Sequence, residues 1–363
     1  MKKFLSFLIC ACLAAGIAMA QTANDCYYTE ATAFTLVGNL FPDTPNPYHR
    51  IDTVRFKGFT ASENLQVREP AGMAVAFRTD SPFIRVLADF GTIGRANSTM
   101  PIAVKGFDLY IKKDGKWLWA AAATQSDGRE ELPLTVIRNL DGTMHECLLY
   151  LPLLSELYSL QIGVADGSSI EALPNPFRHR VVIHGSSFTH GISTSRAGMT
   201  YPAQFARATG IQLLGLGCSG NCRLQSYFAD ALCEVDAEAF IFDSFSNPTE
   251  AEIKERLFPF IEKIQAAHPG KPLIFQRTIY RETRNFNTVN AKVEASRIEL
   301  VDSLMNVACK KYKDVYYVKT TNATAPSHET SVDGVHPDNY GYSLWAESIR
   351  KPILKILRKY GIK

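Results

Sequence analysis

The sequence predicts a two-domain protein, in which a β-sandwich precedes an α/β domain built on a five-stranded parallel, doubly wound sheet. Its 363 residues exceed the length of most single domains, and its 46% hydrophobic content is typical of globular proteins. The spacing of apolar runs changes near residue 174. We therefore expect a first domain at 21–174 and a second at 175–363, after a signal segment at 1–20.

The first twenty residues have the pattern of a secretory signal peptide. Lys2 and Lys3 form a basic start, residues 4–17 form an apolar run, and residues 18–20 (Ala-Met-Ala) suit cleavage after position 20. The run is short for a transmembrane helix, and no later segment reaches the required length. We expect an exported protein, periplasmic or extracellular, with no membrane insertion after cleavage. Lipoprotein anchoring is less favoured, because the residues before the cysteines of the run make a poor lipidation motif.

The charge of the chain gives no reason to expect a nucleic-acid or membrane partner. The formal net charge is +3, and it falls by two if Lys2 and Lys3 leave with the signal segment. Such a near-neutral protein lacks the basic surface that binds phosphate backbones or anionic lipids. The oligomeric state is left open.

The cysteines do not point to a metal site. Of the six that follow the signal segment, only Cys218 and Cys222 are close enough in sequence to suggest a pair. No histidine accompanies them at zinc-site spacing, so we expect neither a metal nor a cofactor. A disulfide and two buried thiols remain equally open.

The first half reads as β-structure. Short apolar runs alternate with turn residues, and Asp114-Gly115 lies between two of them as a hairpin signal. No segment holds a long helical period, so we predict a sandwich. Its expected strands include Met73–Phe77, Ile84–Phe90, Phe107–Ile111, Trp117–Ala121, His145–Leu151 and Tyr158–Val164.

The second half alternates strand-like runs with amphipathic helices, which predicts a parallel sheet covered on both faces. The expected helices begin at Pro202, Thr249, Thr288 and Tyr340; Thr249 opens a capping box. The carboxyl ends of parallel strands meet at one edge, where sites form. The expected strands are Arg180–His184, Gln212–Leu216, Ala239–Asp243, Pro272–Phe275 and Val315–Lys319.

Three residues suggest nucleophilic catalysis at that edge. Asp333 and His336 are three residues apart, close enough for a carboxylate to orient an imidazole, and Ser187 lies in the turn after the first strand. Alone, each has a common structural explanation: Asp333 as a turn residue and Ser187 as a helix cap. Together they indicate a serine hydrolase.

Several segments resemble the SGNH (GDSL-type) hydrolases, whose sheet is flavodoxin-like. The resemblance covers about residues 180–350, and Gly106–Tyr110 (G-F-D-L-Y) resembles the motif of a β-domain fused to one SGNH subfamily. The first and last of these four segments are fairly specific together, and the other two are weak alone. The segments are Gly185–Gly191, Ser219–Asn221, Asp243–Pro248 and Asp333–Pro337.

The resemblance implies a role for each site residue. Ser187 would attack an ester carbonyl, His336 would take its proton, and Asp333 would orient His336. The oxyanion would be held by the backbone N–H groups of Ser187 and Gly220 and by the side-chain amide of Asn247.

Two departures from the family pattern bear on these roles. Ser186 occupies a position where many members have aspartate, so it competes with Ser187 for the role of nucleophile. The third segment lacks the usual Gly-x-Asn-Asp, which leaves Asn247 as the least supported oxyanion donor.

Three other histidines have alternative interpretations. We expect His184, at the end of the first strand, to be a core residue, and His190 to be a candidate for the pocket wall. The segment Tyr48-His49-Arg50, in a proline-rich loop of the first domain, could reach across to the site.

The favoured function is a secreted esterase that removes acetyl or other small acyl groups, with carbohydrate esters as the expected substrates. This choice rests on the resemblance, the expected export and the fused β-domain. A lipid esterase or thioesterase with the same three residues is the enzymatic alternative. An inactive carbohydrate-binding protein is the non-enzymatic alternative, suggested by the departure at the third segment.

Overall fold

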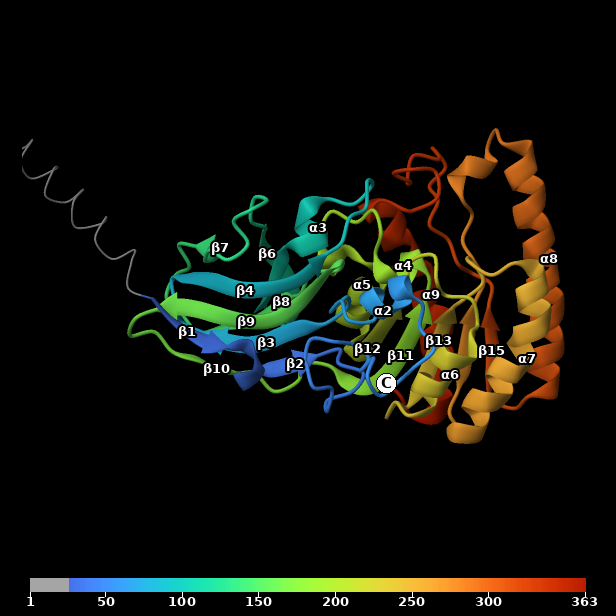
Figure 1. The fold of residues 1–363 in the computed structure, drawn as a ribbon, viewed down its shortest axis with the longest axis horizontal. Helices are drawn as coiled ribbons and strands as arrows, with labels where there is room; N and C mark the ends of the chain where they lie inside the picture. Colours follow the sequence, from blue (N-terminus) through green and yellow to red (C-terminus); the bar gives the residue numbers. More distant parts are fainter. Residues whose placement is uncertain (1–25) are drawn as a thin grey trace, which may run out of the picture.

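The computed structural model describes residues 26–363, and the predicted signal segment lies outside this range. Figure 1 shows a β-domain on the left and an α/β domain on the right, packed side by side. The predicted domain boundary at 174/175 falls in the connection between strands β10 (Ile170–Ala172) and β11 (Arg178–Gly185).

The N-terminal domain consists of two antiparallel sheets, which confirms the predicted β-domain. Apolar residues that include Phe77, Phe107, Leu149 and Leu160 form its core. One sheet has the order β1 (Cys26–Glu30), β9 (Ser155–Ala165), β4 (Phe83–Ile93) and β7 (Leu134–Arg138). The other has the order β10, β3 (Ala74–Thr79), β8 (His145–Tyr150), β5 (Phe107–Lys113) and β6 (Lys116–Ala123), with β2 (Thr35–Val37) beside β3.

Each strand predicted in this half is present, and the Asp114-Gly115 turn joins β5 to β6. Both turn residues have positive φ, 50° and 74°, as a tight hairpin requires. Two short helices were not predicted, α2 (Ala61–Gln66) and α3 (Pro101–Lys105). Neither is long enough to show a helical period in the sequence.

The C-terminal domain contains the predicted five-stranded parallel sheet, flanked by helices on both faces. The strand order is β12 (Ile211–Gly217), β11, β13 (Ala239–Asp243), β14 (Leu273–Gln276) and β15 (Val315–Val318). The helices are α4 (Ser187–His190), α5 (Tyr201–Thr209), α6 (Ser226–Cys233), α7 (Glu250–Ala267), α8 (Thr288–Lys311) and α9 (Asn339–Leu357).

The two faces of this sheet pack against different helices. Residues of α5 and α9 share one core with Val181 and Ile183 of β11, whereas residues of α6, α7 and α8 share the other with Val182. Helix α7 begins with the predicted capping box of Thr249 and Glu252 but ends at Ala267, three residues before Gly270. No helix among residues 26–363 is both long and apolar enough to cross a bilayer.

Polar contacts join the two domains. Asp108 of the G-F-D-L-Y segment accepts hydrogen bonds from Arg196 Nη1 at 3.0 Å and from the backbone N–H of Gly198 at 2.8 Å. Tyr110 OH accepts a further bond from Arg196 at 2.6 Å. This motif therefore holds the segment that follows helix α4.

Candidate active site

The serine turn separates the two candidate nucleophiles. Ser186 caps helix α4, and its hydroxyl donates to Asp243 Oδ2 at 3.1 Å, so it faces the sheet. Ser187, the first residue of α4, has its Oγ 2.9 Å from His336 Nε2. Gly185, which directly precedes Ser186, has no room for a side chain, because a Cβ would lie 2.0 Å from Thr189 Oγ1. Of the two serines, Ser187 is therefore the one that contacts His336, and this residue is 6% exposed.

His336 lies between Ser187 and Asp333 in one hydrogen-bonded chain. Its Nδ1 is 2.8 Å from Asp333 Oδ2, while Asp333 Oδ1 accepts the backbone N–H groups of Val335 and His336 at 2.9 and 2.8 Å. Burial alone would raise the pKa of Asp333, but the hydrogen bonds from His336 outweigh it and lower the pKa. An ionised carboxylate there is suited to hold an Nδ1–H tautomer, leaving Nε2 as an acceptor for Ser187.

A small closed loop fixes the position of His336. A bridge joins Ser331 to Pro337, and Ser331 Oγ donates to the His336 carbonyl at 2.8 Å. At the tip, Gly334 has a φ of 82°, and its carbonyl accepts the Thr283 N–H at 2.8 Å. The loop leads into α9, whose N-cap is Asp338.

The predicted oxyanion donors follow β12 and β13, at the same sheet edge as Ser187. Gly220 has a φ of 73°, and a Cβ there would meet nothing within 4 Å, so its conformation rather than crowding favours glycine. Asn247 Oδ1 accepts the Cys222 N–H at 3.3 Å, which leaves its NH₂ group for another acceptor. Neither Gly220 nor Asn247 lines the groove described below, although Ser219 does. Their role as donors stays a prediction.

A buried carboxyl lies beneath the serine turn. Asp243, which ends β13 opposite Gly185, accepts hydroxyl hydrogen bonds from Ser186 and from Thr189 at 3.0 Å. Burial raises its pKa to about 7, against the lowering effect of these hydrogen bonds. Sequence reasoning placed Asp243 in the third segment but gave it no role; its position at a strand end beside the turn was the available signal.

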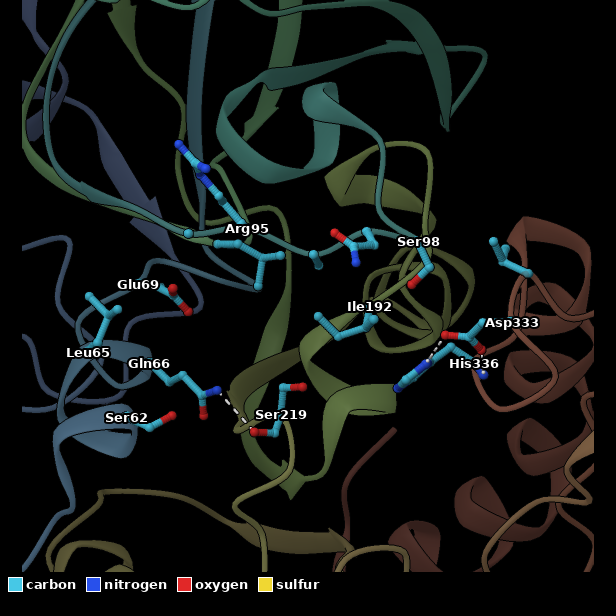
Figure 2. Close-up of a pocket in the computed structure, with 15 residues that line it drawn as sticks. Ser62, Leu65, Gln66, Glu69, Arg95, Ser98, Ile192, Ser219, Asp333 and His336 are labelled. Carbon is cyan, nitrogen blue, oxygen red and sulfur yellow. Dashed lines mark hydrogen bonds and ion pairs between the residues drawn. The ribbon is translucent and has the colours of Figure 1, made fainter. Parts of the chain in front are cut away.

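A groove of about 660 Å³ runs past Asp333 and His336. Both domains form its walls, and Figure 2 shows the N-terminal residues Glu69 and Gln66 across the cavity from His336. No motif in the sequence identified these N-terminal residues. The lining consists of Ser62, Leu65, Gln66, Glu69, Gly94, Arg95, Ala96, Asn97, Ser98, Leu154, Ile192, Ser219, Val332, Asp333 and His336.

The two histidines near the turn are both buried. His184 Nδ1 is 2.9 Å from the Leu216 carbonyl, and burial lowers its pKa to about 4, so it is the core residue that was predicted. The suggestion that His190 lines the pocket was wrong: it is 1% exposed, with Nε2 2.8 Å from the Leu153 carbonyl. His190 Nε2 also lies 3.0 Å from Glu69 Oε2, which does line the groove.

The suggestion that residues 48–50 reach the site holds only in part: Arg50 crosses the domain interface, but none of the three residues lines the groove. The Arg50 guanidinium is fully buried and donates to the carbonyls of Glu69 and Gly217 at 2.7 and 3.0 Å, and to that of Gln66. Gly217 ends the strand that leads to the loop of Gly220. Arg50 thus holds the backbone next to the site by hydrogen bonds, and its side chain does not line the groove.

The cysteine question is resolved in favour of buried thiols. Cys218 and Cys222 are both free and fully buried. Cys222 Sγ donates to Ser244 Oγ at 3.2 Å and lies 3.4 Å from His184 Nε2. Within residues 26–363, no three His, Cys, Asp or Glu side chains form a group that could hold a metal ion.

Comparison with protein-family models identifies both domains. Residues 178–355 match the GDSL-like lipase/acylhydrolase family, and residues 26–170 match the GxDLY domain, described as the N-terminus of SGNH-hydrolase-type esterases. A search of curated proteins finds no match.

Solved structures share the whole two-domain architecture. A Bacteroides ovatus protein described as a GDSL-like lipase is 34% identical, with a TM-score of 0.87 over 92% of this chain and 98% of its own. The salicylyl-acyltransferase SsfX3 of a tetracycline biosynthetic pathway is 19% identical, with a TM-score of 0.72 over 94% of this chain and 100% of its own.

A family two carbohydrate esterase from Cellvibrio japonicus is 10% identical, with a TM-score of 0.62 over 92% of this chain and 98% of its own. At such identities the last two show the fold alone. The family models and the Bacteroides protein together show that this chain belongs to the GDSL-like lipase/acylhydrolase family, as an SGNH-type esterase with a GxDLY N-terminal domain.

Proposed function

We propose that this protein is an exported serine esterase that removes acetyl or other small acyl groups from carbohydrates. The observation that carries the proposal is the hydrogen-bonded chain from Ser187 through His336 to Asp333, in which His336 and Asp333 line the groove. Export rests on the sequence pattern of residues 1–20.

The proposed reaction has two steps. His336 Nε2 takes the Ser187 hydroxyl proton as Oγ attacks the acyl carbonyl, and the protonated imidazole then gives that proton to the departing alcohol. Water hydrolyses the acyl-enzyme with the same base. Backbone N–H groups of Ser187 and Gly220 and the Asn247 amide stabilise the oxyanion, each removed donor costing on the order of 3 kcal/mol in the barrier.

The hydrogen-bonding groups of the groove are the reason to favour a carbohydrate over a long-chain lipid. Polar side chains such as Glu69, Arg95 and Asn97 line it, although apolar atoms make up the larger part of its surface. A long acyl chain would have to desolvate these polar groups without replacing their hydrogen bonds, whereas sugar hydroxyls replace them. The Cellvibrio japonicus carbohydrate esterase, which shares the fold, supports this choice.

The first test is hydrolysis of p-nitrophenyl acetate by the wild-type protein, with Ser187→Ala and Ser186→Ala as a matched pair. We expect Ser187→Ala to lose on the order of 10⁴-fold or more in kcat, and Ser186→Ala to lose far less. The reverse pattern would make Ser186 the nucleophile. Faster turnover of long-chain esters than of acetylated sugars would favour the lipid esterase.

N-terminal sequencing of the exported protein tests the signal segment. We expect the mature protein to begin at Gln21.

A further inference from the structure

The N-terminal domain forms much of the groove wall across from His336. Apart from Leu154, its lining residues come from two segments, residues 62–69 around helix α2 and residues 94–98 between β4 and α3. Figure 2 shows Glu69 and Gln66 on one side of the cavity and Asp333 and His336 on the other. When the ester group of a substrate lies at Ser187, the rest of the substrate therefore contacts the N-terminal domain.

Some polar groups of this wall are already engaged within the protein. The Gln66 amide donates to the Ser219 carbonyl and accepts from Asn221 Nδ2, both at 3.0 Å. Ser62 Oγ also accepts from Asn221 Nδ2, at 3.2 Å. These residues hold the loop that contains Gly220, so their polar groups are not free to form hydrogen bonds with a substrate.

Glu69 differs from them, because part of its carboxylate is left for the groove. The side chain is 3% exposed and lines the cavity; Oε2 lies 3.0 Å from His190 Nε2, and Oε1 has no hydrogen-bond partner among residues 26–363. The buried Arg50 guanidinium interacts electrostatically with Glu69 and offsets its charge. A carboxylate so balanced is suited to accept hydrogen bonds from neutral hydroxyls rather than to bind a cation.

The second segment presents Asn97 on a fixed backbone. Gly94 N–H donates to the Leu154 carbonyl at 2.6 Å, and Thr99 Oγ1 accepts the Ser193 N–H at 2.9 Å. Between these anchors Asn97 is exposed and lines the groove, and its amide has no partner in the described part of the chain. An amide can donate to and accept from neighbouring hydroxyls, as sugar recognition requires.

We infer that Glu69 and Asn97 form the alcohol subsite of the esterase, which recognises hydroxyl groups of a neutral sugar bearing the scissile acyl group. The inference rests on the proposed function. In the reaction, the Ser187 Oγ–acyl bond forms, the acyl–oxygen bond to the sugar breaks, and the proton from Ser187 passes through His336 to the sugar oxygen. Glu69 and Asn97 hold the sugar so that this oxygen faces His336 Nε2.

The test compares two acetyl esters that differ only in the alcohol, ethyl acetate and mono-O-acetylated methyl glucosides. Values of kcat and KM are measured for the wild type, Glu69→Gln, Asn97→Ala and the control Glu171→Gln, an exposed residue of β10 paired with Arg78. We expect Glu69→Gln and Asn97→Ala each to lower the ratio of kcat/KM for the sugar ester to that for ethyl acetate by about tenfold or more. Glu171→Gln should leave the ratio unchanged.

The possible outcomes separate this inference from the proposed function. A wild type that hydrolyses ethyl acetate but no acetylated glucoside contradicts the carbohydrate substrate and the subsite together. A wild type that hydrolyses both, with variant ratios within twofold of its own, contradicts the subsite alone. An equal loss on both esters in Glu69→Gln also overturns the subsite, because Glu69 would then act through His190 on helix α4. Asn97→Ala, in an exposed loop, keeps the test decisive if Glu69→Gln does not fold.

Discussion

Replacing Arg50 by methionine should destabilise the protein, although Arg50 lies outside the groove. The guanidinium is fully buried and is the donor for the carbonyls of Gln66, Glu69 and Gly217. Methionine fills a similar volume but offers no N–H group. The Gln66 carbonyl keeps the Glu69 N–H at 3.3 Å, and each carbonyl left without a partner costs about 1–3 kcal/mol.

The net cost is smaller than the sum of these penalties, because the unfavourable burial of the charge disappears with it. Burial lowers the pKa of Arg50, which is the sign of that unfavourable desolvation. We therefore expect a loss of about 3–5 kcal/mol in the free energy of unfolding. At about 2–4 °C per kcal/mol for a chain of a few hundred residues, Tm should fall by roughly 6–20 °C.

Urea unfolding followed by circular dichroism, together with a thermal scan, measures this change. The matched control is Arg55→Met, a half-exposed arginine paired with Glu234, where we expect a loss below about 1 kcal/mol. If Arg50→Met loses less than about 1 kcal/mol, the buried carbonyls do not depend on this guanidinium and the reasoning fails. Because Gly217 precedes the Gly220 loop, we also expect kcat of the folded variant to fall more than KM changes.

Three further predictions concern the site. Asp333→Asn should lower kcat by on the order of 10⁴-fold with little change in the fold, because an amide favours the wrong imidazole tautomer of His336. Asn247→Ala should lower kcat by about 10²–10³-fold if its NH₂ group holds the oxyanion. Asp243→Asn should remove a pH dependence of stability. Burial raises the pKa of Asp243 in the folded protein to about 7, above its ordinary value of 3.8, so the folded protein holds an extra proton between these pH values and loses stability as pH rises through them.

Each of these has its own contrary result. An active Asp333→Asn protein with an unchanged pH profile would mean that this carboxylate does not orient the base. Less than a threefold loss in Asn247→Ala would remove it from the oxyanion hole. For Asp243, Tm of the wild type minus Tm of the variant should decrease from pH 4 to pH 8, and a flat difference would contradict the raised pKa.

Local signals explain the parts of the fold that could be predicted. Asp114-Gly115 required a hairpin through its φ preferences, and Thr249 with Glu252 capped a helix through contacts three residues apart. The five parallel strands were visible as apolar runs because both faces of that sheet are buried. Helices α2 and α3 escaped prediction since about one turn of helix has no readable period.

The candidate site also has a part that the sequence predicted and a part that the structure added. Ser187, His336 and Asp333 could be proposed from the sequence, because two of them share a short loop and all three follow predicted strands at one sheet edge. The sequence already favoured Ser187 over Ser186, and the structure adds a physical reason, because Ser186 turns towards the buried Asp243.

The sequence by itself thus determined the two-domain fold, the order of the elements and the candidate catalytic residues, because each depends on contacts within a few residues or on a period along one element. Only the tertiary structure decided what surrounds them. Glu69 and Asn97 enter the groove, and Arg50 supports it, through contacts between segments about 100 residues or more apart. Such contacts leave no local pattern, because they arise where two separately folded surfaces meet.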